Sequence, residues 1–137
     1  EPAGAGHYAG DPGFDVAHGE LVSTASDYLR FARMLRDGGL SDGVRFLSEE
    51  SVAAMTRDQV PDVAKTPHSF GADVWKDGSW GYGVFVEESG RYGWSGGQGP
   101  DYAVDPASGR ITILLTQVEM GPTTWGAIAG FRDVLGG

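Results

Sequence analysis

The sequence of 137 residues has no cysteine and no asparagine, and its only lysines are Lys65 and Lys76. Without cysteine the chain can form no disulfide, no thiolate metal site and no cysteine nucleophile. Its 19 aspartate and glutamate residues outnumber 10 lysine and arginine residues, which gives a formal charge of −9. Because phosphate contacts need clustered lysine and arginine, we expect no nucleic-acid partner.

Long hydrophobic runs are also missing. No stretch approaches the roughly 18 consecutive apolar residues that a membrane-spanning helix needs, so no membrane span is expected. The N-terminus opens at Glu1 without a methionine or a basic region, so we interpret it as a cut end rather than a signal peptide. The sequence does not determine the cellular compartment, because proteins without cysteine occur in several compartments.

What is present indicates a folded domain. Hydrophobic residues make up 40% of the chain and aromatic residues 11%, which is enough to enclose a core. The 23 glycines have no fixed period and are spread among the aromatic residues, as in a turn-rich antiparallel sheet. The expected order of elements is two helices, an antiparallel meander and a last helix, which defines an α+β fold.

The first half predicts the two helices. Residues 1–20 are rich in glycine, proline and aspartate and are expected to be irregular coil. Thr24 and Asp27 have the spacing of an N-cap and its partner acid, and the apolar period that follows ends at Gly38–Gly39, an expected C-cap. Ser48 is expected to cap the second helix.

The second half predicts strands and the last helix. Residues 80–87 alternate aromatic or branched residues with glycine, which favours one strand. Further strands are expected at residues 91–94, 100–104 and 111–116. The last of these is almost wholly apolar and is expected to be buried on both faces. Pro122 should begin the final helix, whose apolar side carries Ile128, Phe131 and Leu135.

One segment fits the Gly-x-Ser-x-Gly pattern of a nucleophile elbow, namely Gly93–Gly97. That motif needs a helix directly after the serine, because the strained turn between strand and helix exposes the hydroxyl. Here Gly99–Pro100 and a predicted strand follow, and no histidine lies beyond His68. We therefore do not expect Ser95 to be the nucleophile.

Other candidate groups have structural explanations. The histidines lack the spacing of a zinc site, so we expect neither a metal nor another cofactor; they are His7, His18 and His68. Glu87 and Glu88 are adjacent on a predicted strand and point to opposite faces, so they cannot flank one bond and are expected to be solvated charges. Four aromatic residues fit either a sugar-binding platform or, as we prefer, core packing: Trp75, Trp80, Tyr82 and Tyr92.

Several stretches, taken in order, are similar to one enzyme family. The first is residues 19–39, with Ser-Thr-Ala-Ser-Asp-Tyr at its centre, followed by Leu47–Val52. The others are residues 81–84, 92–99, 102–106 and 113–117. Together they resemble the β-lactamase-related serine hydrolases, which include class C β-lactamases, D-alanyl-D-alanine carboxypeptidases and carboxylesterases of the same fold. The resemblance covers about residues 19–118.

The resemblance implies a substrate site. The family carries Lys-Thr-Gly or His-x-Gly on the strand that edges the catalytic cleft, and Trp94, Ser95 and Gly96 occupy that position. It implies that these three residues bind substrate and that the backbone N–H of Gly97 contributes to the oxyanion hole. Tryptophan in first place supplies no cation for a substrate carboxylate and is similar to the Trp-Gly-Gly variant of the esterase branch. The alternative is that Trp94 is only a packed strand residue.

Two family motifs are missing. No serine is followed by lysine three positions later, so the chain has no Ser-x-x-Lys nucleophile motif. The second motif, Tyr-x-Asn, is excluded by the lack of asparagine, and the five tyrosines are followed two positions on by Gly10, Arg30, Val84, Trp94 and Val104. In the family both motifs precede the matched segments. We therefore expect a C-terminal portion of such an enzyme, inactive by itself.

The resemblance thus implies that residues 1–78 are part of the helical subdomain with connecting loops. Residues 79–137 would be the antiparallel strands and C-terminal helix of the α/β subdomain. The expected function is the C-terminal segment of a serine hydrolase that acts through an acyl-enzyme. Its expected partners are a small-molecule ester, amide or β-lactam, the missing N-terminal portion, and a second copy through self-association. The alternative is a non-catalytic ligand-binding or interaction module of the same fold.

Overall fold

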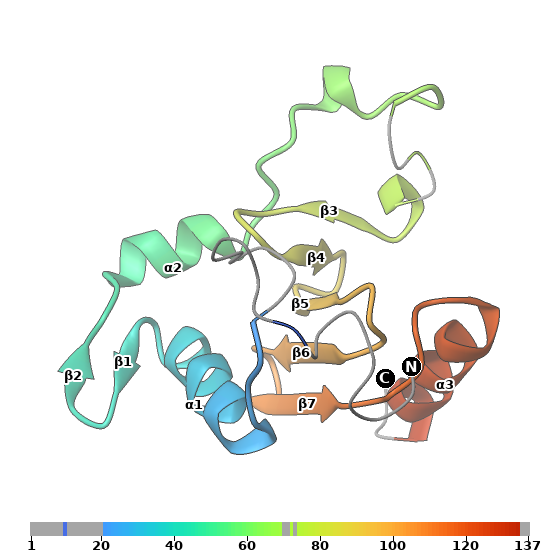
Figure 1. The fold of residues 1–137 in the computed structure, drawn as a ribbon. Coiled ribbons are helices and arrows are strands. Elements are labelled where there is room, and N and C mark those ends of the chain that lie inside the picture. Colours follow the sequence, from blue (N-terminus) through green and yellow to red (C-terminus); the bar gives the residue numbers. More distant parts are fainter. Residues whose placement is uncertain (1–9, 11–20, 70–71, 73, 135–137) are drawn as a thin grey trace.

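The computed structural model describes residue 10, residues 21–69, residue 72 and residues 74–134. Three helices and two antiparallel sheets confirm the α+β class (Figure 1). The helices are α1 (Ala25–Arg36), α2 (Glu49–Met55) and α3 (Pro122–Val134). The strands are β1 (Leu40–Ser41), β2 (Val44–Arg45), β3 (Gly78–Trp80), β4 (Phe85–Glu87), β5 (Tyr92–Ser95), β6 (Asp101–Asp105) and β7 (Arg110–Leu114). The predicted coil at 1–20 lies outside the described residues except at residue 10, and so do His7, His18 and Leu135.

The main sheet is a meander in the order β3-β4-β5-β6-β7, with every neighbouring pair antiparallel. In the β5–β6 hairpin Trp94 pairs with Tyr102 and Ser95 pairs with Asp101. Ser95 and Asp101 are the last pair of this ladder, so residues 96–100 form the connection that leaves and re-enters the sheet there.

Helix α1 begins and ends as its sequence predicts. The Asp27 N–H donates to Thr24 Oγ1 at 3.1 Å, and the Thr24 hydroxyl donates to the Asp27 carboxylate at 2.9 Å. At the other end Gly38 has φ +63°, its N–H donates to Leu35 O, and the Gly39 N–H donates to Met34 O. This pair of bonds is a Schellman motif, which needs the left-handed conformation that glycine adopts without steric cost.

The connection from α1 to α2 is also determined by residues that are close in sequence. Asp42 and Gly43 both have positive φ, 49° and 78°, as a two-residue turn between β1 and β2 requires. The Ser48 hydroxyl then accepts from the Ser51 N–H at 3.0 Å and caps α2, as predicted. The short apolar hairpin and α2 therefore follow α1 without a long loop.

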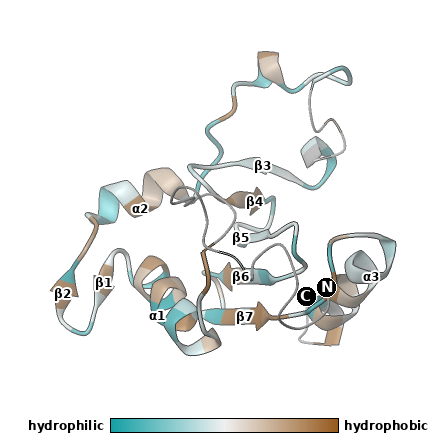
Figure 2. Cartoon of the chain, in the orientation of Figure 1, coloured by the Kyte–Doolittle hydropathy of each residue, from teal (hydrophilic) through white to brown (hydrophobic). Residues whose placement is uncertain are grey.

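The core lies between α1, α2 and one face of the main sheet. Because side chains alternate along a strand, Tyr92 and Val104 face the same side as Val86, toward Leu35 of α1 and Val52 of α2. Figure 2 shows hydrophobic positions on α1, β4 and β7 in brown. Helix α3 lies on the other side of the sheet in the view of Figure 1, and its contact side chain Ile128 is fully buried.

Two predictions about the strands are wrong. Residues 80–87 form two strands, β3 and β4, because Gly83 has φ +79° and turns the chain between them. The strand predicted at 111–116 ends at Leu114, and only Thr112 within β7 is buried. Among the described strands β7 is the last of the sheet order, so none of them lies beside it on its outer side.

Candidate functional site

A pocket of about 290 Å³ lies between the start of α1 and the β5–β6 hairpin. Two of the residues that the family resemblance implies for substrate binding, Trp94 and Gly96, line it. The remaining lining residues come from the segment before α1, from α1, and from the sheet: Leu21, Ser23, Thr24, Tyr28, Pro100, Asp101, Tyr102, Ile113 and Leu115. Among the described residues, the lining is mostly apolar and contains no lysine, arginine or histidine.

Trp94 is the most accessible aromatic residue of this wall, with 45% of its surface exposed. Its ring lies against Trp80 of β3, with centroids 4.4 Å apart and planes tilted by 54°. On the β4 side, β5 is paired only at Tyr92 and Gly93, so the backbone beyond them has no strand partner there. Trp94 is thus held by packing on one side and open to the pocket on the other.

The floor of the pocket is uncharged. Tyr28 and Tyr102 lie edge to face with ring centroids 5.0 Å apart, and both line the pocket. Burial raises the pKa of Tyr28 and, more strongly, the pKa of Tyr102, because the anionic form would lose its hydration. Both hydroxyls therefore stay protonated at neutral pH and act as neutral hydrogen-bonding groups.

The turn after β5 contributes Gly96 to the lining of the pocket, whereas Gly97 is not among the lining residues. The Gly96 N–H donates to Pro100 O at 2.8 Å and the Gly99 N–H donates to Gly96 O at 2.9 Å, which closes the turn. Gly97 accepts from the Met120 N–H at 2.8 Å. Among the described residues, no acceptor receives the N–H of Gly97 itself, and this residue is exposed.

Ser95 is placed differently from its neighbours. Its side chain is 9% exposed, and its hydroxyl donates to Asp101 Oδ1 at 2.7 Å. Trp94 and Tyr102 point toward α1, so Ser95 and Asp101, one position along each strand, point to the opposite face. The serine hydroxyl is thus engaged inside the protein, and it is absent from the lining of the pocket.

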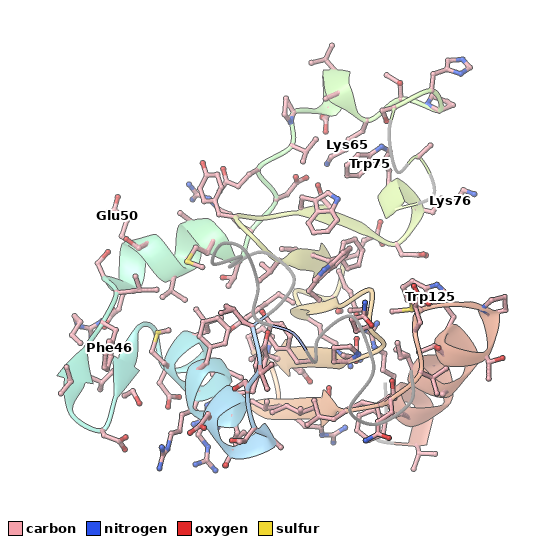
Figure 3. The ribbon with its side chains drawn as sticks, in the orientation of Figure 1. Phe46, Glu50, Lys65, Trp75, Lys76 and Trp125 are labelled. Carbon is pink, nitrogen blue, oxygen red and sulfur yellow. The ribbon has the colours of Figure 1, made fainter. Side chains whose placement is uncertain are left out.

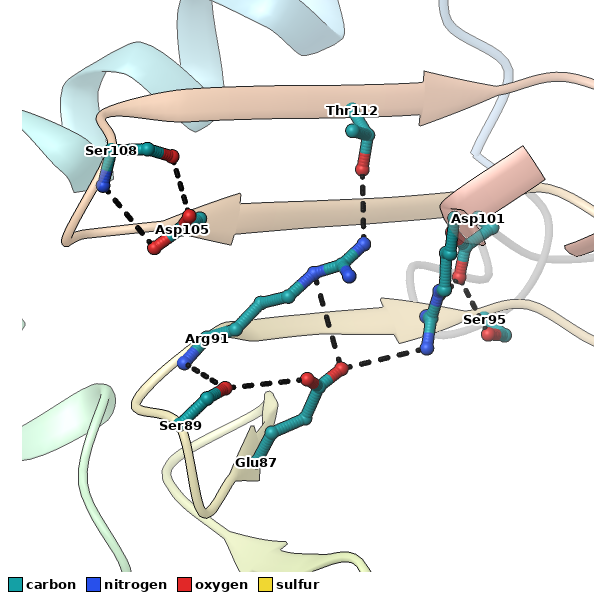
Figure 4. Close-up of polar contacts among 9 residues, drawn as sticks. Glu87, Ser89, Arg91, Ser95, Asp101, Asp105, Ser108 and Thr112 are labelled. Carbon is teal, nitrogen blue, oxygen red and sulfur yellow. Dashed lines mark hydrogen bonds and ion pairs between the residues drawn. The ribbon is translucent and has the colours of Figure 1, made fainter. Parts of the chain in front are cut away.

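Figure 4 shows the polar network on that opposite face, which sequence reasoning missed. Arg132 of α3 binds Asp101 with a shortest distance of 2.7 Å and Glu87 at 3.5 Å. Glu87 also lies 3.9 Å from Arg91. Glu87 was expected to be a solvated charge, which is wrong: it bridges two arginines, because the arginine from α3 reaches it over a sequence separation that no local pattern encodes.

The other candidate residues lie elsewhere. His68 is exposed in the connection between α2 and β3, where Trp75 donates to the Ser69 hydroxyl; Figure 3 shows Trp75 close to Lys65 in this connection. Tyr92 is buried in the core and Tyr82 is 59% exposed, so the four aromatic residues form no single platform. Within the described ranges, no three histidine, aspartate or glutamate side chains converge as a metal site would require.

Comparison with known proteins identifies the family. A family model described as Beta-lactamase matches residues 1–130. The chain therefore belongs to the β-lactamase family, which confirms the resemblance seen in its sequence. In the part of the chain that the structure describes, no helix has the length and apolar character to cross a membrane.

Similar proteins cover this chain but extend well beyond it. Protein Rv1367c of Mycobacterium tuberculosis (strain H37Rv) is 37% identical over 119 residues, which is 77% of this chain and 30% of that protein. Penicillin-binding protein 4 of Amycolatopsis lactamdurans is 39% identical over 122 residues, 87% of this chain and 31% of that protein. The chain thus spans about 30% of the length of these curated relatives.

Among solved structures, a β-lactamase crystal structure from Bacteroides dorei DSM 17855 aligns with a TM-score of 0.45 and 17% identity. The alignment covers 79% of this chain and 39% of that one.

Proposed function

We propose that this chain is the cleft-edge portion of a serine hydrolase that acts on small-molecule esters or amides through an acyl-enzyme. In this proposal the Gly97 N–H stabilises the oxyanion and Trp94 and Gly96 form one wall of the cleft, whereas Ser95 lies outside the lining. The nucleophile comes from a part of the protein outside these 137 residues, since no serine here has lysine three positions on.

The observation that carries the proposal is the position of Gly97. A backbone N–H without an acceptor among the described residues follows directly after Gly96, which lines the pocket. Around it, two hydrogen bonds fix the turn and a third holds the Gly97 carbonyl to Met120. Because donors that are already oriented need no reorganisation when negative charge develops, such an amide can stabilise an oxyanion.

The charge of the pocket favours esters over β-lactams. A β-lactam of the penicillin or cephalosporin type carries a carboxylate, and its binding would require a cation near the reacting carbonyl. In the part of the lining that the structure describes there is no lysine, arginine or histidine, and the floor of Tyr28 and Tyr102 is neutral. Trp94 instead offers an apolar face, on which an uncharged acyl or aryl group can pack.

The test is reconstitution. The purified chain is mixed with the separately expressed segment encoded upstream of it, and p-nitrophenyl butyrate or a chromogenic cephalosporin is added. We expect hydrolysis only in the mixture, with the ester as the better substrate. A fluorophosphonate probe should label the upstream segment in the mixture and leave this chain unlabelled.

Absence of labelling in a mixture that forms a stable complex would contradict the proposal. It would favour the alternative, a non-catalytic ligand-binding module of the same fold. Replacing Gly97 with proline removes the N–H and should lower the rate of labelling, whereas Gly97→Ala keeps the N–H and should not. Melting curves of both variants report whether the turn still forms.

A further inference from the structure

Three side chains connect the C-terminal helix to the end of the hairpin that carries the candidate site. The Asp101 side chain is fully buried and accepts a hydrogen bond from Ser95 at 2.7 Å on one side. On the other side Arg132 reaches both of its oxygens, with Nη2 2.7 Å from Oδ1 and Nε 3.4 Å from Oδ2. By the alternation of the strands, these side-chain contacts lie on the face of the sheet opposite Trp94 and Tyr102.

The cluster of Ser95, Asp101 and Arg132 lies at the end of the β5–β6 hairpin, next to the turn of the candidate site. Ser95 and Asp101 are cross-strand partners and form the last pair before the turn of residues 96–100. The bond between their side chains therefore closes the base of the turn, and Arg132 fixes that base from behind. Gly96, which lines the pocket, and then Gly97 follow directly after this closed base.

We infer that Arg132 and Asp101 are positioning residues that set the orientation of the Gly97 amide through Ser95. This inference rests on the proposed oxyanion role of Gly97, but the structural coupling it asserts can be measured without any catalysis. It assigns α3 a function at the site, although the described part of this helix contributes no residue to the pocket.

The physical argument is the cost of leaving the carboxylate unpaired. A buried charge that loses its partner is strongly destabilised, so Asp101 stays in place only while both Arg132 and Ser95 hold it. Arg132 can hold it in a fixed direction because its planar guanidinium meets both carboxylate oxygens. Glu87, 3.5 Å from Arg132, keeps the guanidinium oriented from a neighbouring strand.

The experiment measures amide hydrogen exchange and ¹H–¹⁵N chemical shifts of the full 137-residue chain. The variants are Ser95→Ala, Asp101→Asn, Arg132→Met and Arg132→Lys. The matched control is Asp105→Asn, which changes an aspartate at the other end of β6 that binds the Ser108 side chain and the Ala107 N–H. Exchange at Val52 in the core reports global unfolding.

We expect Asp101→Asn and Arg132→Met to accelerate exchange of the Gly96 amide about tenfold or more, since one charge-assisted hydrogen bond is lost in each. The Gly97 resonance should move in both variants, and Arg132→Lys should restore part of the change. Ser95→Ala removes a single hydroxyl, is not expected to unfold the chain, and should shift the same two resonances. Asp105→Asn should leave them in place.

Two results would overturn the inference. One is a set of Gly96 and Gly97 resonances that stays unchanged in Ser95→Ala and Arg132→Met. The other is an acceleration at Val52 as large as that at Gly96, which would mean a general loss of stability. In the reconstituted enzyme, Arg132→Lys should lower kcat more than it raises KM. If reconstitution shows no activity, the exchange data still show whether Arg132 and Asp101 orient the Gly97 amide. Failure of the proposed function can therefore be told apart from failure of this inference.

Discussion

The ring of Trp94 lies 4.4 Å from the ring of Trp80, measured between their centroids, and joins the pocket wall to the first strand of the sheet. Trp80 comes from β3 and Trp94 from β5, although these strands are not neighbours in the sheet. Aromatic pairs at this separation contribute about 0.5–1.5 kcal/mol beyond the area they bury. Trp94, which the sequence resemblance places at the family's cation position, is therefore both a packing residue and a lining residue here.

Replacing Trp94 with lysine should raise the preference of the reconstituted enzyme for a substrate that carries a carboxylate. The new ammonium would stand in the first position of the triplet, next to the neutral pocket. We expect the ratio of kcat/KM for the cephalosporin to that for p-nitrophenyl butyrate to rise about 1.4- to fivefold in the reconstituted enzyme. This range corresponds to the ~0.2–1 kcal/mol of an ion pair at a half-exposed position.

The control for this change is Trp94→Met, which also removes the indole ring but adds no charge. Both variants lose the contact with Trp80, so their melting temperatures should fall together. Equal ratios for the lysine and methionine variants would show that charge at residue 94 does not select the substrate.

Gly99 should tolerate no side chain. It has φ +92°, and a Cβ atom there would lie 2.0 Å from Val118 O and 2.3 Å from Thr116 Oγ1. Gly99→Ala should therefore destabilise the chain by about 2–4 kcal/mol, through strain and displacement of the backbone of residues 116–118. Urea unfolding measures the change.

The matched variant is Gly97→Ala, in the same turn. A Cβ atom at Gly97 meets nothing within 4 Å, and its φ lies outside the left-handed region. Its free energy of unfolding should stay within about 0.5 kcal/mol of the original chain. A similar loss of unfolding free energy in both variants would mean that close packing at Gly99 does not stabilise the turn.

Asp58 should make the stability of the chain depend on acid pH. Its carboxylate binds Lys65, the Ser79 hydroxyl and, at 2.9 Å, the Val60 N–H. The Lys65 ammonium, followed by the Ser79 hydroxyl, lowers the pKa of Asp58 from 3.8 to about 2. Because the folded state then binds the proton less tightly than the unfolded state, this stabilisation is complete above pH ~4.

The stabilisation is lost as the pH falls from about 4 toward about 2, where Asp58 becomes protonated in the folded chain too. Melting temperatures measured over this range should fall less steeply in Asp58→Asn than in the original chain. Asp62→Asn is the control, because Asp62 is fully exposed and lies 3.8 Å from the same Lys65. If the melting temperature falls equally steeply with pH in Asp58→Asn and in the original chain, Asp58 is not the source of this pH dependence.

The features that could be predicted from the sequence are those fixed by neighbouring residues. The caps at Thr24 and Ser48 and the Schellman end at Gly38–Gly39 depend on side chains within a few positions, and all are confirmed. The hairpin at 81–84 was missed because its glycines fit the alternation of a strand equally well. Only the positive φ of Gly83 separates the two interpretations.

The candidate site was predictable in part for the same reason. The order of short motifs singled out Trp94 and Gly96, and the structure places both in the lining of the pocket, while their part in substrate binding stays a prediction. The role of Asp101 could not be read from the sequence, because its partner Arg132 is 31 residues away and on a different element. Strand alternation puts Ser95 on the face opposite Trp94, but no local pattern reveals that Arg132 of α3 binds its partner Asp101 there.

An apolar groove predicts how the isolated chain behaves in solution. Phe31 of α1, Val44 of β2 and Phe46 line a groove of about 390 Å³ between α1 and the β1–β2 hairpin. They are 40%, 56% and 66% exposed, and Figure 3 shows Phe46 on this hairpin, far from the main sheet. Exposed apolar patches of this kind usually mark a surface covered by a partner.

We expect the rest of the parent protein to cover this groove and, without it, a second copy of the chain to do so. Sedimentation velocity should show self-association that grows with concentration, and Phe46→Asp should weaken it, because a carboxylate in the groove must be desolvated on contact. Val63→Asp is the control, since Val63 is 85% exposed but lies outside the groove. A monomer at every concentration that melts cooperatively would contradict the expectation, as would an equal effect of Val63→Asp.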